Sequence, residues 1–166
     1  RGLAAALTFG ADGVAMGTRF LLTRESPTPE TTKQAYLQAQ VTEIPVSTRL
    51  DGLPQRMVMN KRLAELERSG AMKLLVLALT NAWRFKRQMN SSYIEVLKAA
   101  WDMARNSDMT LGQTLMAANA PMIIKQAMVE GQPENGVLPS GQVAGLIDDL
   151  PSCPELLDNM INDALA

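Results

Sequence analysis

The stretch from Gly10 to Phe20 holds the residues of this chain whose types and spacing best suit ligand binding. A glycine turn precedes a short apolar run, and Gly17-Thr18 then opens a helix-forming segment. Free backbone N–H groups in the first turn of a helix bind anions. Gly17 leaves room for a phosphate, and the Thr18 hydroxyl adds a hydrogen bond. A buried strand that ends in an ordinary glycine turn has the same local pattern, so both interpretations stay open.

The scarcity of His and Cys limits the nucleophilic and metal-binding chemistry that this chain could carry. The sequence has no His and one Cys, which excludes Ser-His and Cys-His nucleophile pairs and the usual zinc sites within this chain. Asp148 and Asp149 are adjacent, so they face different directions and lack metal-ligand spacing. Cys153 stands at an expected helix start, but without an adjacent cation we expect a structural thiol. We predict no metal site.

Composition and charge narrow the classes of partner. The chain is 46% hydrophobic and 20% charged, with a mean hydropathy of -0.04, as in ordinary soluble proteins. Sixteen Lys and Arg against 17 Asp and Glu argue against a nucleic-acid or anionic-membrane partner. The longest apolar stretch, Leu74–Leu79, is far shorter than the roughly 20 residues of a membrane span. A single cysteine suits a reducing compartment, so we expect a cytoplasmic protein.

The N-terminal third is expected to contain short elements. Apolar spacing predicts a helix over Gly2–Phe9, followed by a strand over Gly13–Met16. Thr28 is a good N-cap, with Pro29 at the first helical position, for a helix that runs to about Gln40. Two extended segments, Thr42–Thr48 and Gln55–Met59, flank a turn and predict a hairpin.

The rest of the chain is expected to be mainly helical. Asn60 is expected to cap a helix through Ser69. Further helices are expected over most of 72–106 and over Thr110–Ala118 and Met122–Glu130, with a loop at Gly131–Gly136. Near the end, Ser152 and Glu155 have the spacing of a capping box. The helix that they begin carries apolar residues on one face, which needs a surface to bury against.

The Gly10–Phe20 segment resembles the nitronate monooxygenase family, once called 2-nitropropane dioxygenases. A second block, Val137–Ser152, is similar to the C-terminal signature of that family, and the two blocks stand in the family's order. The resemblance covers essentially all 166 residues. It implies FMN and an α/β fold, the (β/α)₈ TIM barrel. A barrel of this type needs about 250 residues.

The resemblance also implies a domain plan. Residues 1–24 would be the last helix-strand unit of the barrel with the phosphate-binding turn. Residues 25–136 would form a mainly helical lid or substrate subdomain with a short hairpin, and residues 137–166 would return to the barrel. We expect the chain to be the C-terminal part of the barrel, with the N-terminal half in the same protein or on another chain.

The residues expected to bind FMN are also implied by the resemblance. Gly17 and Thr18 would hold the phosphate, and Ala15 and Met16 would lie near the flavin. The family often has Gln in place of Ala15, which puts a polar contact there in doubt. The family's His base would lie outside this chain.

The second block adds three candidates with two roles each. Gly141 and Gly145 would approach the cofactor or let a helix pack closely, since glycine permits close backbone contact. Gln142 would meet the flavin ring edge or a substrate, because its amide can both donate and accept. A helix-start turn without a ligand is the alternative for this position.

Three basic residues are candidates for substrate binding. Arg56 stands in a segment that resembles the family's Gly-x-Pro-x-Arg, and it would bind an anionic group or form a structural salt bridge. Arg84 and Lys86 lie in Trp-Arg-Phe-Lys-Arg, which suits the phosphates and adenine of coenzyme A or a solvated helix face. This block is similar to a branch that acts on acyl-CoA intermediates of steroid-ring breakdown in actinobacteria.

The expected activity is the oxidation of a small nitronate with O₂ by an FMN-dependent oxidoreductase, a flavin-dependent monooxygenase. A flavin-dependent dehydrogenase or reductase acting on an acyl-CoA, or an NADH:quinone reductase, is the alternative. A barrel fragment that is inactive alone is a third interpretation.

Overall fold

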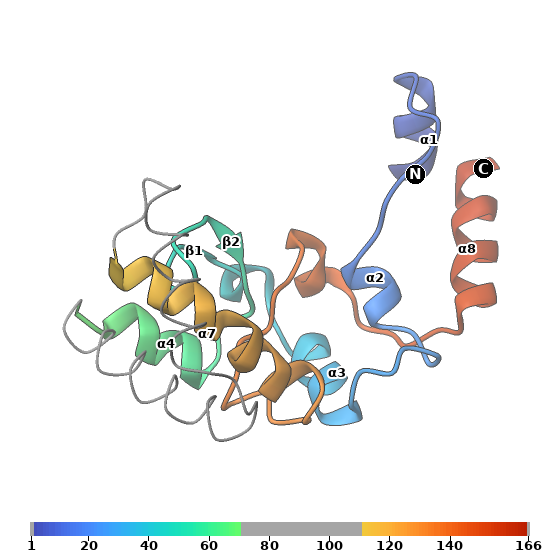
Figure 1. Cartoon of the computed structure of the whole chain (residues 1–166). Helices are drawn as coiled ribbons and strands as arrows, with labels where there is room; N and C mark the ends of the chain where they lie inside the picture. The colour runs from blue at the N-terminus through green and yellow to red at the C-terminus, as the bar shows by residue number, and fades with distance from the viewer. Residues whose placement is uncertain (1, 71–110, 166) are drawn as a thin grey trace.

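The computed structural model describes residues 2–70 and 111–165 (Figure 1). In these two stretches helices lie beside a two-stranded hairpin, while α1 (Gly2–Thr8) and α8 (Cys153–Leu165) extend away from this body side by side (Figure 1). Arg84, Lys86, Leu74–Leu79 and the helices expected over 72–106 lie outside the described residues. No helix within the described stretches is both long and apolar enough to cross a membrane.

The segment from α1 to α2 differs from the sequence prediction in one respect. Helix α1 spans Gly2–Thr8, as predicted, and α2 spans Thr18–Leu21. The strand expected over Gly13–Met16 is wrong for this structure, because these residues form an irregular connection. A strand exists through hydrogen bonds to a neighbour, and no other part of the described chain pairs with this segment.

Helix α3 spans Glu30–Leu37 and packs into the body of the molecule. The predicted helix therefore exists but is shorter. Its N-cap position is occupied by Pro29 without a side-chain cap, so the cap expected from Thr28 is wrong. The Thr28 amide instead donates to the Ser26 hydroxyl at 3.4 Å, forming a tight turn before the helix.

The predicted hairpin is present but short. Strand β1, Val46–Ser47, pairs antiparallel with β2, Gln55–Arg56. A 3₁₀ turn, η1 at Val41–Glu43, occupies the start of the first extended segment. Helix α4 then spans Lys61–Arg68, and the Asn60 side chain accepts the Leu63 amide at 2.8 Å, which confirms the predicted cap.

Helix α7 corrects another prediction. It spans Leu111–Met128 without a break, although Pro121 lies inside it. The sequence predicts two helices separated near Asn119-Ala120-Pro121, because the residue before a proline is disfavoured in the helical conformation. Pro121 is exposed, whereas Ile123 and Ala127 are buried in the two apolar clusters of the body. Their burial holds one continuous helix across the proline. The loop expected at Gly131–Gly136 comes next in the chain.

Two clusters of buried side chains hold the body together. The first joins the hairpin region, α4 and α7, and consists of Leu50, Met57, Leu63, Leu66, Ala120, Ile123 and Val137. The second joins α2, α3 and α7 to the C-terminal block, and consists of Leu22, Tyr36, Ile44, Val58, Ala127, Leu138, Ala144 and Ile147. Residues 137–147 are therefore anchored in the core of the body, and this anchoring sets the position of the turn that begins at Gln142.

That 3₁₀ turn, η2 at Gln142–Leu146, packs directly on η1 at Gly145. A Cβ added to Gly145 would lie 2.6 Å from the Val41 Cα and 2.7 Å from the Gln40 carbonyl carbon. Both obstacles are backbone, which cannot move as a side-chain end does. This close packing is one of the two roles that the sequence suggested for Gly145.

We expect Gly145→Ala to destabilise the protein by about 1–3 kcal/mol, because overpacking a close contact forces the backbone apart. Thermal or denaturant unfolding of the variant measures this. Gly70→Ala is the matched control, because a Cβ there meets no atom within 4 Å. Equal stability of the two variants would contradict the close packing of η2 on η1.

Candidate functional site

The turn at Gly17-Thr18 retains free backbone donors. Within residues 2–70 and 111–165, the amides of Gly17, Thr18 and Arg19 donate no hydrogen bond. Gly17 is exposed, and a Cβ added to it would meet no atom within 4 Å. The turn therefore offers unpaired N–H groups beside open space. An anionic group needs both conditions to approach the backbone.

The Thr18 hydroxyl connects this turn to the second sequence block. The Gly141 amide donates to Thr18 Oγ1 at 2.8 Å, across 123 residues of chain. A second connection is the ion pair between Arg19 Nη2 and Asp149 Oδ1, at 2.7 Å. The structure thus brings Gly17, Thr18 and Gln142, which begins η2, into one region.

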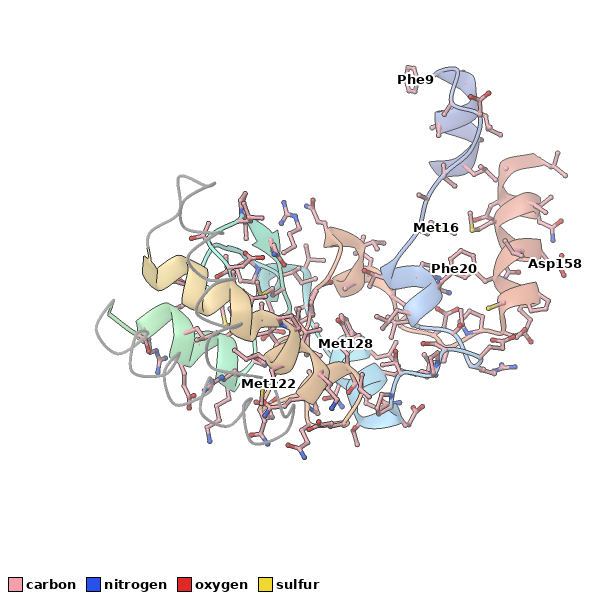
Figure 2. All side chains as sticks on the ribbon, in the orientation of Figure 1. Phe9, Met16, Phe20, Met122, Met128 and Asp158 are labelled. Atoms are coloured by element: carbon pink, nitrogen blue, oxygen red, sulfur yellow. The ribbon has the colours of Figure 1, made fainter. Side chains whose placement is uncertain are left out.

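Ala15 and Met16 lie on the connection that leads into this turn. Ala15 is exposed, and Met16 is half-buried and lines a cavity of about 840 Å³. Side chains from α1, η2 and α8 line the same cavity, among them Leu3, Val143 and Met160. Figure 2 shows Met16 beside this space and the Phe20 ring lying toward α8. The mainly apolar lining suits the burial of further apolar groups.

The side chains of Gln142 and Arg56 make few polar contacts with the described residues. Gln142 is exposed and makes no hydrogen bond to the described residues through its side chain. Arg56 lies on β2, and its Nη1 donates to the Ile44 carbonyl at 3.4 Å. The salt bridge that the sequence offered as one role for Arg56 is not formed with any described carboxylate.

The acidic side chains and Cys153 in the described part of the chain form no group of three or more that could hold a metal ion. Asp149 instead pairs with Arg19, which is consistent with a structural role for this acidic residue.

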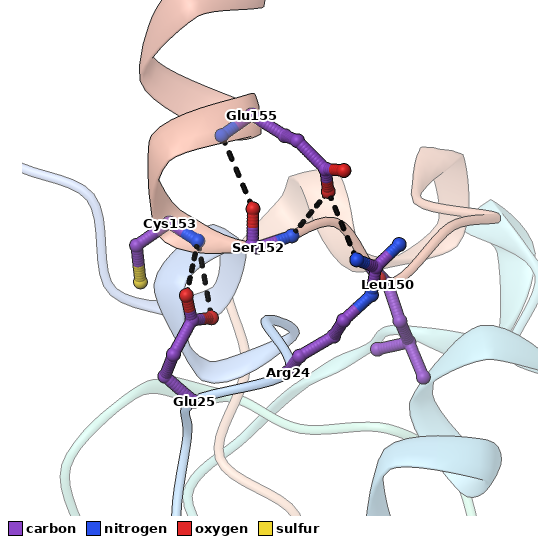
Figure 3. A network of polar contacts seen from close by, with 6 residues as sticks. All are labelled: Arg24, Glu25, Leu150, Ser152, Cys153 and Glu155. Carbon is purple, nitrogen blue, oxygen red and sulfur yellow. Dashed lines mark hydrogen bonds and ion pairs between the residues drawn. The ribbon is translucent and has the colours of Figure 1, made fainter.

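A network of polar contacts caps the N-terminus of α8, which spans Cys153–Leu165 (Figure 3). The predicted capping box is confirmed: the Ser152 amide donates to Glu155 Oε2 at 2.7 Å, and the Glu155 amide donates to Ser152 Oγ at 3.3 Å. Both carboxylate oxygens of Glu25 accept the Cys153 amide, at 2.9 and 3.0 Å. Arg24 adds an ion pair to Glu155 at 3.3 Å. We call these four acidic, basic and capping side chains, with Cys153, the α8 clasp.

The clasp predicts a pH dependence of stability. The hydrogen bond from the Cys153 amide lowers the pKa of Glu25, and the bond from the Ser152 amide lowers the pKa of Glu155, both below the ordinary 4.5. A carboxyl group whose pKa is lower in the folded state stabilises above its unfolded pKa. That stabilisation is lost as the pH falls through the folded pKa. We therefore expect the melting temperature to fall as the pH drops below about 4.5.

Glu25→Gln should reduce this dependence, because Gln does not titrate. Melting temperatures of the complete protein and the variant, compared between roughly pH 6 and pH 3, measure the difference. Asp158→Asn is the control, since Asp158 is exposed on α8 and makes no contact in the clasp. Parallel pH curves for wild type and Glu25→Gln would contradict the role of Glu25.

Two site contacts were missed by the sequence reasoning. Nothing in the local pattern of Gly141 shows that its amide meets Thr18, and nothing in Glu25 shows that it caps a helix 128 residues away. Both contacts join segments that the fold alone brings together.

Comparison with solved structures identifies the class of fold. FabK from Thermotoga maritima is similar over 99% of this chain and 40% of its own, with a TM-score of 0.57 and 22% identity. A mutant of the same protein gives a TM-score of 0.61 at 21% identity, over 99% of this chain and 38% of its own. With the family match below, these neighbours imply a TIM-barrel fold, although the described residues close no barrel.

The sequence comparison identifies the family. The nitronate monooxygenase model matches residues 1–163, and the chain belongs to this family. The resemblance seen in the two sequence blocks is thereby confirmed.

Curated relatives refine the comparison. The chain is 47% identical, over 99% of its length, to "(3aS,4S,5R,7aS)-5-hydroxy-7a-methyl-1-oxo-octahydro-1H-indene-4-carboxyl-CoA dehydrogenase" of Rhodococcus jostii, and 46% identical, over the same share, to the protein of that name in Mycobacterium tuberculosis. A "Probable nitronate monooxygenase" of Bacillus subtilis is 33% identical over 56% of the chain and 28% of its own length. The chain spans about half the length of the first two relatives, 47% and 46%.

Proposed function

We propose that this chain is the C-terminal part of an FMN-dependent oxidoreductase whose N-terminal barrel half completes the active site. The family match carries the proposal, and the free amides at Gly17-Thr18 support it. On this proposal residues 1–24, 25–136 and 137–166 form the last barrel unit, the helical subdomain and the returning segment. The catalytic base lies on the N-terminal half, since the chain has no His.

The residues present fit the phosphate of FMN. Three amides at the turn are free, Gly17 leaves open space, and Thr18 retains a hydroxyl proton after accepting the Gly141 amide. The chain binds the phosphate here, and Met16 covers an apolar part of the flavin from the adjoining cavity. Ala15 and Gln142 complete the proposed cofactor-binding set. Bound FMN supplies two-electron redox chemistry.

We propose an acyl-CoA as the substrate class, because the two relatives that match 99% of the chain are named as dehydrogenases of a carboxyl-CoA, which is an acyl thioester of coenzyme A. This reverses the order that the sequence suggested, in which nitronate oxidation came first. The relative named for nitronate matches 56% of the chain at lower identity, so a small nitronate is the second candidate. Arg56, which has no ion-pair partner among the described residues, is a proposed contact for an anionic substrate group, as are Arg84 and Lys86 in the coenzyme A interpretation.

The test uses the complete protein under anaerobic conditions. We expect an acyl-CoA to bleach the flavin absorbance and a small alkyl nitronate to leave it unchanged. Bleaching by the nitronate alone would assign the second candidate and contradict the first. A complete protein that binds no flavin would contradict the oxidoreductase itself.

A paired variant tests the basic residues. Replacing Arg84 and Lys86 together by Ala should raise KM for an acyl-CoA and leave kcat nearly unchanged, because remote contacts act mainly on binding. Replacing Lys61 and Arg68, two exposed basic residues of α4, by Ala is the matched control. Equal KM values for the two double variants would contradict a role of Arg84 and Lys86 in binding coenzyme A.

A further inference from the structure

We propose that Gly141 is a positioning residue for the flavin phosphate, and that it acts through the Thr18 hydroxyl. This inference rests on the proposed FMN site. The observation behind it is the 2.8 Å hydrogen bond from the Gly141 amide to Thr18 Oγ1. On this proposal Gly141 takes part in cofactor binding without touching the cofactor, because it acts through Thr18.

The chemistry of a hydroxyl group explains what this contact does. A threonine hydroxyl has one proton to donate and two lone pairs to accept with. The Gly141 amide occupies one lone pair, so the hydroxyl is held in place while its proton stays free to donate. Among the described residues no acceptor takes that proton. A phosphate oxygen at the turn is the acceptor that the proposed site supplies, and a donor that already accepts a hydrogen bond is polarised and strengthened.

Gly141 itself is held firmly by the chain on its N-terminal side. The Ser140 amide donates to the Arg56 carbonyl at 2.9 Å, and the Tyr36 hydroxyl donates to the Pro139 carbonyl at 2.6 Å. The Val58 amide donates to the Leu138 carbonyl at 3.0 Å, and Leu138 and Tyr36 are buried in the second cluster. The position of the Gly141 amide is therefore set by the core of the body.

Glycine at position 141 permits the close approach to Thr18. A Cβ added there would lie 3.3 Å from Thr18 Oγ1, closer than most such contacts, and would push the hydroxyl by a few tenths of an ångström. The φ angle of Gly141 is −84°, which alanine adopts freely. Gly141→Ala therefore keeps the amide donor and the backbone shape, and it changes mainly the position of the hydroxyl.

Riboflavin lacks the phosphate of FMN, and this difference separates positioning from general stability. The complete protein is stripped of flavin, and dissociation constants for FMN and riboflavin are measured by fluorescence titration. We expect Thr18→Val to reduce the preference for FMN over riboflavin about tenfold or more, as loss of a hydrogen bond to a charged group does. Thr18→Ser should retain the preference, because it keeps the hydroxyl. Thr48→Val, at an exposed threonine of the hairpin turn, is the matched control and should change nothing.

Gly141→Ala decides the proposal. We expect it to lower the FMN preference severalfold in the wild-type background and to have no further effect on that preference in Thr18→Val, because its action passes through the hydroxyl. An unchanged preference in Gly141→Ala, equal losses for FMN and riboflavin, or the same loss in the Thr18→Val background would each overturn the proposal. Wild-type protein that binds neither flavin would instead contradict the proposed function.

Discussion

Glutamate in place of Gly17 is expected to leave the complete protein without bound flavin. The new carboxylate would stand where the phosphate approaches the free amides of the turn, and two negative groups repel each other there. A hydrogen bond to a charged group contributes about 1.5–3 kcal/mol, so losing one weakens binding roughly tenfold to hundredfold. The ratio of flavin to protein absorbance after gel filtration measures the loss.

The structure makes this variant a clean probe. Gly17 is exposed with φ of −94°, and a Cβ there meets no atom within 4 Å, so the substitution does not strain the described fold. Gly70→Glu is the matched control, with the same change of charge at a second exposed glycine in open space. An unchanged flavin ratio in folded Gly17→Glu protein would show that the phosphate binds elsewhere.

Residues 1–166 expressed alone are expected to self-associate rather than form a stable monomer. Large apolar side chains in or beside α1, η2 and α8 are exposed: Phe9 to 92%, Leu146 to 73% and Leu165 to 82%. Figure 2 shows Phe9 beside the end of α1. Burying one such side chain is worth roughly 1.5–3 kcal/mol. Several of them together are comparable to the ~5–15 kcal/mol stability of a typical domain. Light scattering and thermal melting of the isolated chain measure the effect.

Surface variants test whether the exposed apolar side chains cause this self-association. Replacing Phe9 and Leu146 together by Ser should lower the scattering of the isolated chain, because both are large apolar side chains that are strongly exposed. Replacing Val129, which is 65% exposed at the end of α7, by Ser is the control and should leave the scattering unchanged. A monomer that melts sharply and cooperatively without the upstream half would contradict the half-barrel proposal.

Local sequence signals were sufficient where an element is stabilised by its own residues. Asn60 caps α4, and the Ser152–Glu155 capping box begins α8, both as predicted, because the interacting groups lie three residues apart. The two family blocks are also recognisable from sequence alone, because each is a short contiguous motif. The hairpin was predicted in place and lost only length.

The sequence predictions were wrong where the local structure depends on residues that lie far away in the sequence. Pro121 marked a break that burial of Ile123 and Ala127 prevents, so α7 is continuous. Residues 13–16 have the composition of a strand, but a strand forms through hydrogen bonds to neighbouring strands, and the described chain offers none. Local propensity predicts neither the burial that keeps α7 continuous nor the absence of a pairing strand, because both depend on residues elsewhere in the fold.

The sequence by itself therefore determined the family, the proposed phosphate-binding turn at Gly17-Thr18 and two helix caps, since each depends on residues close along the chain. Only the tertiary structure decided that the Gly141 amide meets the Thr18 hydroxyl and that Glu25 caps α8. The physical reason is the same in both cases. A hydrogen bond forms within about 3 Å, and the packing of the buried clusters, rather than spacing in the sequence, brings residues more than 120 positions apart to that distance.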